Sequence, residues 1–225
     1  MARRQLHDKY FRQAKEEGYV ARSAYKLADI DRKWRLLRRG DRVLDLGCSP
    51  GSWLQVASQR VGPDGLVVGI DLKAISPEVR AANVRAKQGD AFETDPASLV
   101  QEAGGVFDVV LSDMAPNTSG AGDDSASVWL CRRVLEVARG ALREQGALVM
   151  KVLEGGEYPD LLRETAGLFA QAKGYKPPAS RAVSREMFIV ATGFKAEAPQ
   201  RDASAARTGG PPAPSPGWSS GGSVS

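Results

Sequence analysis

The sequence is poor in the residues that usually hold metals or disulfides. Its 225 residues include two cysteines and one histidine. Cys48 and Cys131 lie far apart without zinc-site spacing, and His7 has no ligand cluster beside it. We therefore expect two reduced thiols and no metal site.

Long apolar runs are also missing. No run approaches the roughly 18 residues that span a bilayer, and the basic N-terminus lacks the apolar stretch of a secretory signal. The length suits one full-size domain, and no coiled-coil pattern indicates self-association. These features predict a soluble, cytoplasmic monomer that does not contact membranes.

Charge is unevenly distributed along the chain. Residues 1–42 contain 13 Lys and Arg against 6 Asp and Glu, a net charge of +7, while the whole chain carries +4. A basic segment on a near-neutral body fits a polyanion such as RNA or DNA, although a solvated helix surface explains the charge equally well. Its cations include Arg3, Arg4, Lys9, Arg12, Arg22, Arg32, Lys33, Arg35, Arg38 and Arg39.

Strand and helix patterns alternate along most of the chain, which predicts a largely parallel sheet with helices on both faces. Strands are expected at 43–46, 66–70, 83–88, 106–111, 147–151, 175–182 and 187–192. Helices are expected at 3–17, 24–38, 52–60, 125–142 and 158–172, with a polar loop at 116–124. The last two strands, joined by the link from Val183 to Glu186, predict an antiparallel hairpin whose turn lies at the carboxyl edge of the sheet.

Three regions follow from these patterns. Residues 1–40 are expected to form a basic helical segment packed on the α/β domain of residues 41–195. Residues 196–225 are mostly Ala, Pro, Gly and Ser, and they predict a disordered tail because they bury too little apolar surface to offset the entropy of ordering.

A glycine-rich turn follows the first strand: Asp45-Leu46-Gly47-Cys48-Ser49-Pro50-Gly51. Its glycines do not match the dinucleotide pattern G-x-G-x-x-G, which disfavours NAD. Glycine lets a ligand approach the backbone closely, so Gly47 is expected to turn the chain and Gly51 to leave room for a ligand near Trp53.

Two acidic residues follow the next two strands. Asp71 is placed to accept hydrogen bonds from ribose hydroxyls, and Asp90 is placed to accept one from an adenine amino group. Together with the turn, they predict an adenosine-bearing ligand without a pyrophosphate, such as S-adenosylmethionine. The alternative is an ordinary strand–turn–helix unit with surface acids.

Two lysines and two carboxylates complete the candidate site. Lys26, Asp113, Lys151 and Glu186 each lie in a separate segment, three of them at or beside a predicted strand end. The carboxyl ends of parallel strands meet at one crevice, where these groups can transfer protons without a metal. Taken singly, a lysine at a strand end usually reaches only solvent.

The segments that contain these residues resemble the FtsJ/RrmJ family over residues from about 5 to 195. They are Ser23-Ala24-Tyr25-Lys26-Leu27, residues 43–53, Leu111-Ser112-Asp113-Met114-Ala115-Pro116-Asn117, Val149-Met150-Lys151-Val152 and residues 181–186. The resemblance implies a Rossmann-like class I methyltransferase with a seven-stranded sheet, which uses S-adenosylmethionine to methylate RNA at the ribose 2′-OH.

The resemblance also implies roles for the matching residues. Lys151 would be the base that takes the 2′-OH proton, and Lys26, Asp113 and Glu186 would complete the tetrad. The cofactor site would be lined by Gly51, Trp53, Asp71, Asp90 and Asp113, beside Gly47. The departures are small, with Cys48 and Ser49 where the family often has alanine and Ser52 where it often has glycine.

Within the family, the match favours the branch that methylates a uridine in the A-loop of 23S rRNA. The implied partner is large-subunit rRNA within the 50S ribosomal subunit. Methylation of tRNA or another RNA is the alternative with the same chemistry. A non-catalytic, RNA-binding ribosome assembly factor and a small-molecule methyltransferase are alternatives of other classes.

Overall fold

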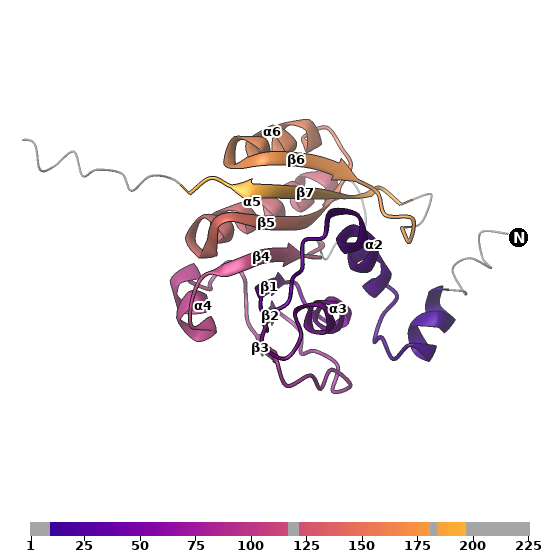
Figure 1. Cartoon of the computed structure of the whole chain (residues 1–225). Coiled ribbons are helices and arrows are strands. Elements are labelled where there is room, and N and C mark those ends of the chain that lie inside the picture. The colour runs from indigo at the N-terminus through magenta and orange to yellow at the C-terminus, as the bar shows by residue number, and fades with distance from the viewer. Residues whose placement is uncertain (1–9, 117–121, 181–183, 197–225) are drawn as a thin grey trace, which may run out of the picture.

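The computed structural model describes residues 10–116, 122–180 and 184–196. Its strands form one seven-stranded sheet in the order β3-β2-β1-β4-β5-β7-β6 (Figure 1). The strands are β1 (Arg42–Leu46), β2 (Leu66–Asp71), β3 (Val84–Gln88), β4 (Phe107–Ser112), β5 (Leu142–Leu153), β6 (Phe169–Tyr175) and β7 (Glu186–Phe194). The helices are α2 (Ala24–Trp34), α3 (Ser52–Val61), α4 (Pro96–Ala103), α5 (Asp123–Ala141) and α6 (Tyr158–Leu168), preceded by a helical stretch at 10–16.

Strand pairing confirms the predicted sheet. β3, β2, β1, β4 and β5 pair in parallel, while β7 runs antiparallel to both β5 and β6. Glu186 begins β7 opposite Leu153 near the end of β5. The antiparallel strand therefore starts at the edge where the parallel strands end, as the sequence predicted.

Two apolar layers separate the sheet from its helices. Leu44 and Leu148 belong to a core shared with α4, α5 and α6, whereas Val43 and Val149 belong to a core shared with α2 and α3. Successive strand residues point to opposite faces, so the continuous apolar strands fill both layers. Helix α2, which contains Lys26, therefore packs on the same face of the sheet as α3.

Helices α2 and α4 differ from the sequence-based prediction. Helix α2 ends at Trp34 rather than at residue 38, because Arg35 adopts a left-handed conformation with φ of 53°. Helix α4 was not predicted. The Asp95 side chain caps it by accepting from the Ala97 backbone N–H, and Pro96 occupies its first turn, which is a recognised start signal.

The predictions for the C-terminal strands were partly wrong. Helix α6 ends at Leu168, and β6 begins at the next residue instead of near 175. Pro177 and Pro178 follow β6 closely, and proline cannot donate to a strand ladder. Strand β5 also begins earlier than predicted, at Leu142, with an irregular register opposite β4.

Some predictions fall outside the described residues. These are the start of the first helix, most of the polar loop, part of the link before Glu186 and nearly all of the tail. Within the described ranges, no helix is long and apolar enough to cross a bilayer.

Candidate active site

Lys151 and Asp113 meet at the carboxyl ends of neighbouring strands. Met150 of β5 pairs with Ser112 of β4, which places the next residue of each strand side by side. The Lys151 Nζ donates to the Asp113 carbonyl oxygen at 2.6 Å and lies 2.9 Å from Asp113 Oδ1. The contact with Oδ1 is a charge contact without hydrogen-bond geometry, since that oxygen has no hydrogen-bond partner among the described residues. The backbone carbonyl thus orients the amine.

Lys26 and Glu186 form a second ion pair. Lys26 lies in the first turn of α2, and its Nζ donates to Glu186 Oε2 at 2.9 Å. The same Nζ lies 5.8 Å from the centre of the Phe188 ring. Burial on its own raises the pKa of Glu186, but the nearby Lys26 and, less strongly, Lys151 lower it below its usual value. Both lysines therefore act electrostatically on one carboxylate.

Helix α2 is attached to the turn that begins α3. The Ser23 and Ser52 hydroxyls lie 2.7 Å apart, and the Trp53 indole N–H donates to the Ser23 carbonyl oxygen at 2.9 Å. Leu27 and Ile30 of α2 are fully buried. These contacts fix the start of α2 over the sheet and so set the position of Lys26.

The structure brings all four predicted tetrad residues to one edge of the sheet. The Lys26 and Lys151 residues are almost fully buried, with 6% and 8% exposure, while the side chains of Asp113 and Glu186 are 21% and 24% exposed. Each ammonium group has a carboxylate partner. Two buried cations are thereby balanced, as burial of charge requires.

A cavity of about 990 Å³ adjoins the Lys151–Asp113 pair. It is lined by the ends of β1 to β4 and by α5, and its lining includes the predicted residues Gly47, Asp71, Asp90 and Asp113. Its volume is within the range of small-molecule sites. Asp113 is the residue that both lines the cavity and contacts Lys151.

Gly47 is required by close backbone packing. It has φ of 79°, and a Cβ at this position would lie 2.5 Å from Met114 Cγ and 2.9 Å from the Met114 backbone nitrogen. A larger residue would push Met114 into the cavity. The glycine thus keeps the turn close to the segment that contains Asp113.

Backbone amides hold the two predicted ligand carboxylates. Asp71 accepts from the Ser49 N–H at 2.9 Å through Oδ2 and from the Lys73 N–H at 2.8 Å through Oδ1. Asp90 accepts from the Phe92 N–H at 2.8 Å. Each carboxylate oxygen has two lone pairs, so these groups keep capacity for hydroxyl or amino donors of a ligand.

Gly51 and Trp53 do not belong to the cavity lining. A Cβ on Gly51 would lie 2.6 Å from Val79, so this glycine admits the loop after β2. Trp53 is 2% exposed and packs beside Phe188, with ring centroids 5.8 Å apart. In this structure Trp53 supports α2 rather than the cavity wall.

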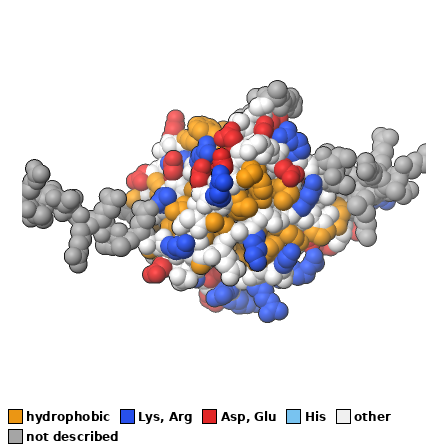
Figure 2. All heavy atoms as spheres, turned by 90° about the horizontal axis from the view of Figure 1, so that it is seen from above, with side chains coloured by type: hydrophobic (Ala, Val, Ile, Leu, Met, Phe, Trp, Pro, Cys, Tyr) orange, Lys and Arg blue, Asp and Glu red, His pale blue; other side chains and the backbone are white. Residues whose placement is uncertain are grey.

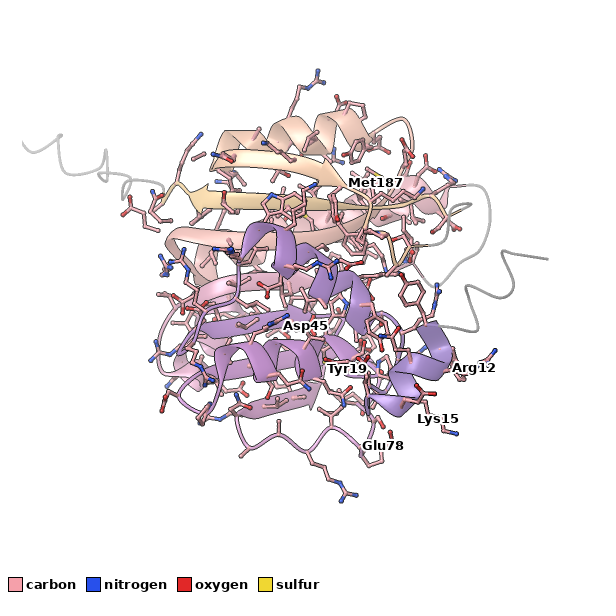
Figure 3. All side chains as sticks on the ribbon, turned by 45° about the vertical axis from the view of Figure 1, so that its right-hand side comes forward. Arg12, Lys15, Tyr19, Asp45, Glu78 and Met187 are labelled. Atoms are coloured by element: carbon pink, nitrogen blue, oxygen red, sulfur yellow. The ribbon has the colours of Figure 1, made fainter. Side chains whose placement is uncertain are left out.

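Asp45 is a buried carboxyl group without a hydrogen-bond partner among the described residues. It comes from β1, inside the fold (Figure 3), whereas Arg12 and Lys15 extend outward. Burial, followed by the charges of Asp113 and Asp71, raises the pKa of Asp45 well above its usual value. A carboxyl group in these surroundings is favoured in its neutral form.

Sequence reasoning missed an apolar rim around the cavity. Leu72 and Trp129 are 56% and 58% exposed, and Trp129 stacks on Phe92 with ring centroids 3.9 Å apart. All three line the cavity. A helical wheel of α5 places Val128 and Cys131 toward the core and Trp129 away from it, which was the available signal.

Comparison with known proteins identifies the family of the chain. Residues 19–194 match the model of the FtsJ-like methyltransferase family. The chain belongs to the FtsJ-like methyltransferases. A relative from Syntrophobacter fumaroxidans, ribosomal RNA large subunit methyltransferase E, is 45% identical over 82% of this chain and 94% of its own. The protein of the same name from Methanothrix thermoacetophila is 45% identical over 84% of this chain and 73% of its own.

Solved structures show the same fold. A putative ribosomal RNA methyltransferase from Plasmodium falciparum has a TM-score of 0.69 and 26% identity, covering 80% of this chain and 100% of its own. Fibrillarin from Aeropyrum pernix, solved with S-adenosylmethionine bound, has a TM-score of 0.54 and 21% identity, covering 76% of each chain. The second likeness bears on the fold alone.

The cavity of this FtsJ-like methyltransferase suits the predicted cofactor, S-adenosylmethionine. Its lining contributes the carboxylates of Asp71, Asp90 and Asp113, and the cofactor carries a sulfonium cation. Leu72, Phe92 and Trp129 add apolar surface at the rim, which suits a purine ring. Acidic and apolar groups therefore both match the ligand chemistry.

Proposed function

We propose that this protein transfers a methyl group from S-adenosylmethionine to the ribose 2′-OH of a uridine in the A-loop of 23S rRNA, within the large ribosomal subunit. Lys151 is the general base in this proposal. The names of the relatives support a large-subunit rRNA substrate, and the arrangement of Lys26, Asp113, Lys151 and Glu186 supports the chemistry.

One observation carries the proposal. Asp113 lines the cavity and also contacts Lys151 through its carbonyl oxygen and its carboxylate. A base and a ligand cavity that share one residue lie next to each other. A hydroxyl placed between them can therefore meet both the base and the methyl donor, which is the positioning that group transfer requires.

The reaction needs a proton acceptor at Lys151. When bound, the cofactor supplies an electrophilic methyl group on sulfur. Lys151 accepts the 2′-OH proton as the new O–C bond forms and the S–C bond breaks, so the products are the 2′-O-methyl ribose and S-adenosylhomocysteine. Lys151 needs a free lone pair for this step, so it must first lose one proton of the ammonium form that contacts Asp113; its hydrogen bond to the Asp113 carbonyl oxygen holds the nitrogen in place.

The remaining groups position and balance charge. The Lys26 ammonium, neutralised by Glu186 at 2.9 Å, lies at the same edge and can donate to the ribose or the adjoining phosphate. Asp113 places negative charge beside the cavity, which favours a sulfonium. Orientation and electrostatic complementarity of this kind lower reaction barriers.

The basic N-terminal region supplies RNA affinity. Helix α2 contains Lys26 in its first turn and Arg32 and Lys33 in its last turn, and lysine and arginine bind phosphates without reading sequence. The selection of one nucleotide then depends on RNA shape and on a base removed from its stack.

The test uses large ribosomal subunits from cells that lack this gene, incubated with purified protein and methyl-labelled S-adenosylmethionine. We expect label on one A-loop uridine, located by nuclease digestion and mass spectrometry, and loss of that label with Lys151→Ala. Transfer RNA serves as a parallel substrate. Label on tRNA alone would replace the substrate, and label on neither RNA would contradict the enzymatic proposal.

A further inference from the structure

A cation and two aromatic rings form a cluster at the end of α2. Trp34 and Tyr175 meet edge to face with ring centroids 4.6 Å apart. The Lys33 Nζ lies 4.7 Å from the Trp34 ring centre and 4.3 Å from that of Tyr175. Lys33 is exposed, and both rings are partly exposed. We call Lys33, Trp34 and Tyr175 the aromatic platform.

The platform is contiguous with the candidate active site. Tyr175 is the cross-strand partner of Phe188, and the Phe188 ring lies beneath the Lys26 ammonium. Residues directly opposite in an antiparallel pair share one face and are neighbours. The Phe188 ring therefore connects Lys26 of the tetrad to Tyr175 of the platform across the neighbouring strands β7 and β6.

Sheet order gives this continuity a direction. The cavity occupies the ends of β1 to β4, the two ion pairs lie over β4, β5 and β7, and the platform lies over β6. With cofactor in the cavity, an RNA strand whose ribose reaches Lys151 cannot continue over β1 and β2. The open direction at this edge runs over β7 and β6, toward Tyr175.

The surroundings of the platform are strongly basic. Lys173 is exposed and shares a strand face with Tyr175, and Arg35 and Lys176 are exposed nearby in the chain. Asp29, the acid close to Tyr175, is engaged by Arg32. Figure 2, which views the molecule from above Figure 1, shows hydrophobic side chains with lysine and arginine near them and acidic side chains among them. Aromatic surface with basic borders is what single-stranded nucleic acid binds.

We infer that the aromatic platform binds a nucleotide adjacent to the methylated one, with its base stacked on the ring surface that Lys33 now covers. The Lys33 ammonium moves from the rings to the phosphate of that nucleotide. Its long, flexible side chain allows this movement, and base stacking on aromatic rings tolerates any sequence. The inference rests on the proposed RNA substrate and adds the place where the strand leaves the crevice.

Four variants test the inference, with methylation of large subunits from gene-deficient cells as the assay. Tyr175→Leu removes the ring but keeps apolar volume, and Tyr175→Phe keeps the ring. Lys33→Ala removes the phosphate contact. Lys87→Ala is the control, because it removes an exposed lysine of β3 that pairs with Glu102 of α4, at the opposite edge of the sheet from β6. Thermal melting confirms that each variant is folded.

We expect Tyr175→Leu to raise the KM for subunits by at least about 5-fold, the lower end for loss of one stacked base, with kcat and the Kd for cofactor changed less than about 2-fold. Tyr175→Phe should keep the wild-type KM. Lys33→Ala should raise KM and lower the dependence of log(kcat/KM) on log salt by about one unit. Lys87→Ala should change neither quantity.

The outcomes separate the two proposals. Wild-type activity on subunits combined with an unchanged KM in Tyr175→Leu and Lys33→Ala overturns the platform alone. Equal effects of Tyr175→Phe and Tyr175→Leu also overturn it, because stacking needs the ring and not the hydroxyl. If the wild-type protein does not methylate subunits at all, the proposed function fails and the platform fails with it.

Discussion

The carboxylates on the two sides of the crevice have different partners. On the β5–β7 side, Glu186 and Asp113 each have a lysine within 2.9 Å. On the cavity side, Asp71 is held by backbone amides, and Asp45 has no hydrogen-bond partner in the described part of the chain. One side pairs its carboxylates with lysines, while on the other side the Asp71 and Asp90 carboxylates line the cavity and accept from backbone amides.

This difference indicates which side receives a cation. The Asp71 and Asp90 carboxylates beside a cavity of about 990 Å³ favour a positively charged ligand, in agreement with a sulfonium cofactor. The lysine-paired side can approach a polyanion without strong repulsion, because its lysines offset its acids. The substrate and the cofactor are thereby directed to different halves of one crevice.

Removing the Lys151 amine from the lysine-paired side of the crevice should have the largest effect on activity. Lys151→Ala should lower kcat by at least about 10²-fold, the usual scale of general-base catalysis, because no other group replaces the amine. Initial rates with excess cofactor measure kcat, and calorimetry should show a nearly unchanged Kd for S-adenosylmethionine. Lys87→Ala is the matched control. A Lys151→Ala rate near the wild-type rate would contradict the assignment.

Replacing Asp45 by asparagine tests, through the pH dependence of stability, whether the Asp45 carboxyl group is neutral in the folded protein. Its pKa is higher in the folded than in the unfolded protein, so the folded state holds this proton more tightly. The resulting stabilisation is complete below the unfolded pKa, near 3.9, and is lost as pH rises toward the folded pKa. Asp45→Asn lacks this loss. As pH rises, the free energy of unfolding of Asp45→Asn minus that of wild type should therefore increase by up to about 1.4 kcal/mol per pH unit.

Urea unfolding at pH 5 to 9 measures this difference. Asp64→Asn, at an exposed position, should show the wild-type pH dependence. A constant difference between Asp45→Asn and wild type across this range would show that Asp45 is ionised in the folded protein.

Removing one charge from the cavity should weaken cofactor binding. Asp71→Asn should raise the Kd for S-adenosylmethionine roughly 10-fold, since hydrogen bonds to charged groups contribute about 1.5–3 kcal/mol. The asparagine side chain also has a single acceptor oxygen for the Ser49 and Lys73 amides. Calorimetric titration measures Kd, with Asp64→Asn as control, and an unchanged Kd would remove Asp71 from the ligand set.

The smallest expected change is the shift in the pKa of Glu186 when the Lys26 charge is removed. Lys26 lowers the pKa of Glu186, so Lys26→Met should raise that pKa, observed by carbon-13 NMR of the carboxyl groups with Glu186→Gln for assignment. In wild type, the stabilisation from ionised Glu186 is complete above the unfolded pKa, near 4.3, and is lost as pH falls through the folded pKa. Lys87→Met should leave the titration unchanged, and an identical titration in Lys26→Met would contradict the pair.

Much of the fold was predictable because chemistry and local pattern agree. The buried strands β1, β2 and β4 are short apolar runs ending in turns or acids, and parallel strands then place Asp71 and Asp113 at one edge. The antiparallel start of β7 placed Glu186 there as well. These features depend on neighbours in sequence and on a general rule of sheet topology.

The differences between the predicted and observed helix boundaries have local physical causes. Arg35 ends α2 in a left-handed conformation that is unusual for a residue other than glycine, so no sequence signal marked it. Helix α6 passes directly into β6 at Phe169 without a breaker. Helix α4 is different, because its sequence contains a start signal, the N-cap Asp95 followed by Pro96.

The pairing within the candidate site was not predictable from sequence. The four charged residues were expected in one crevice, but the partner of each lysine depends on how α2 lies over the sheet. The burial of Asp45 without a hydrogen-bond partner among the described residues also depends on three-dimensional packing. Its sequence segment has only the pattern of a ligand-binding turn. Trp53 shows the reverse case, as a residue expected at the cofactor and found supporting α2.

The link between Trp53 and Ser23 limits how this protein could have been assembled in evolution or could be re-engineered. The basic N-terminal segment is not an exchangeable RNA-binding attachment, because it supplies Lys26 and is bonded to the first turn of α3. A graft that retargeted the enzyme would have to keep Ser23, Lys26 and their contacts while replacing the outer surface. New specificity is therefore expected to arise by substitution on α2 and β6 rather than by exchange of whole segments.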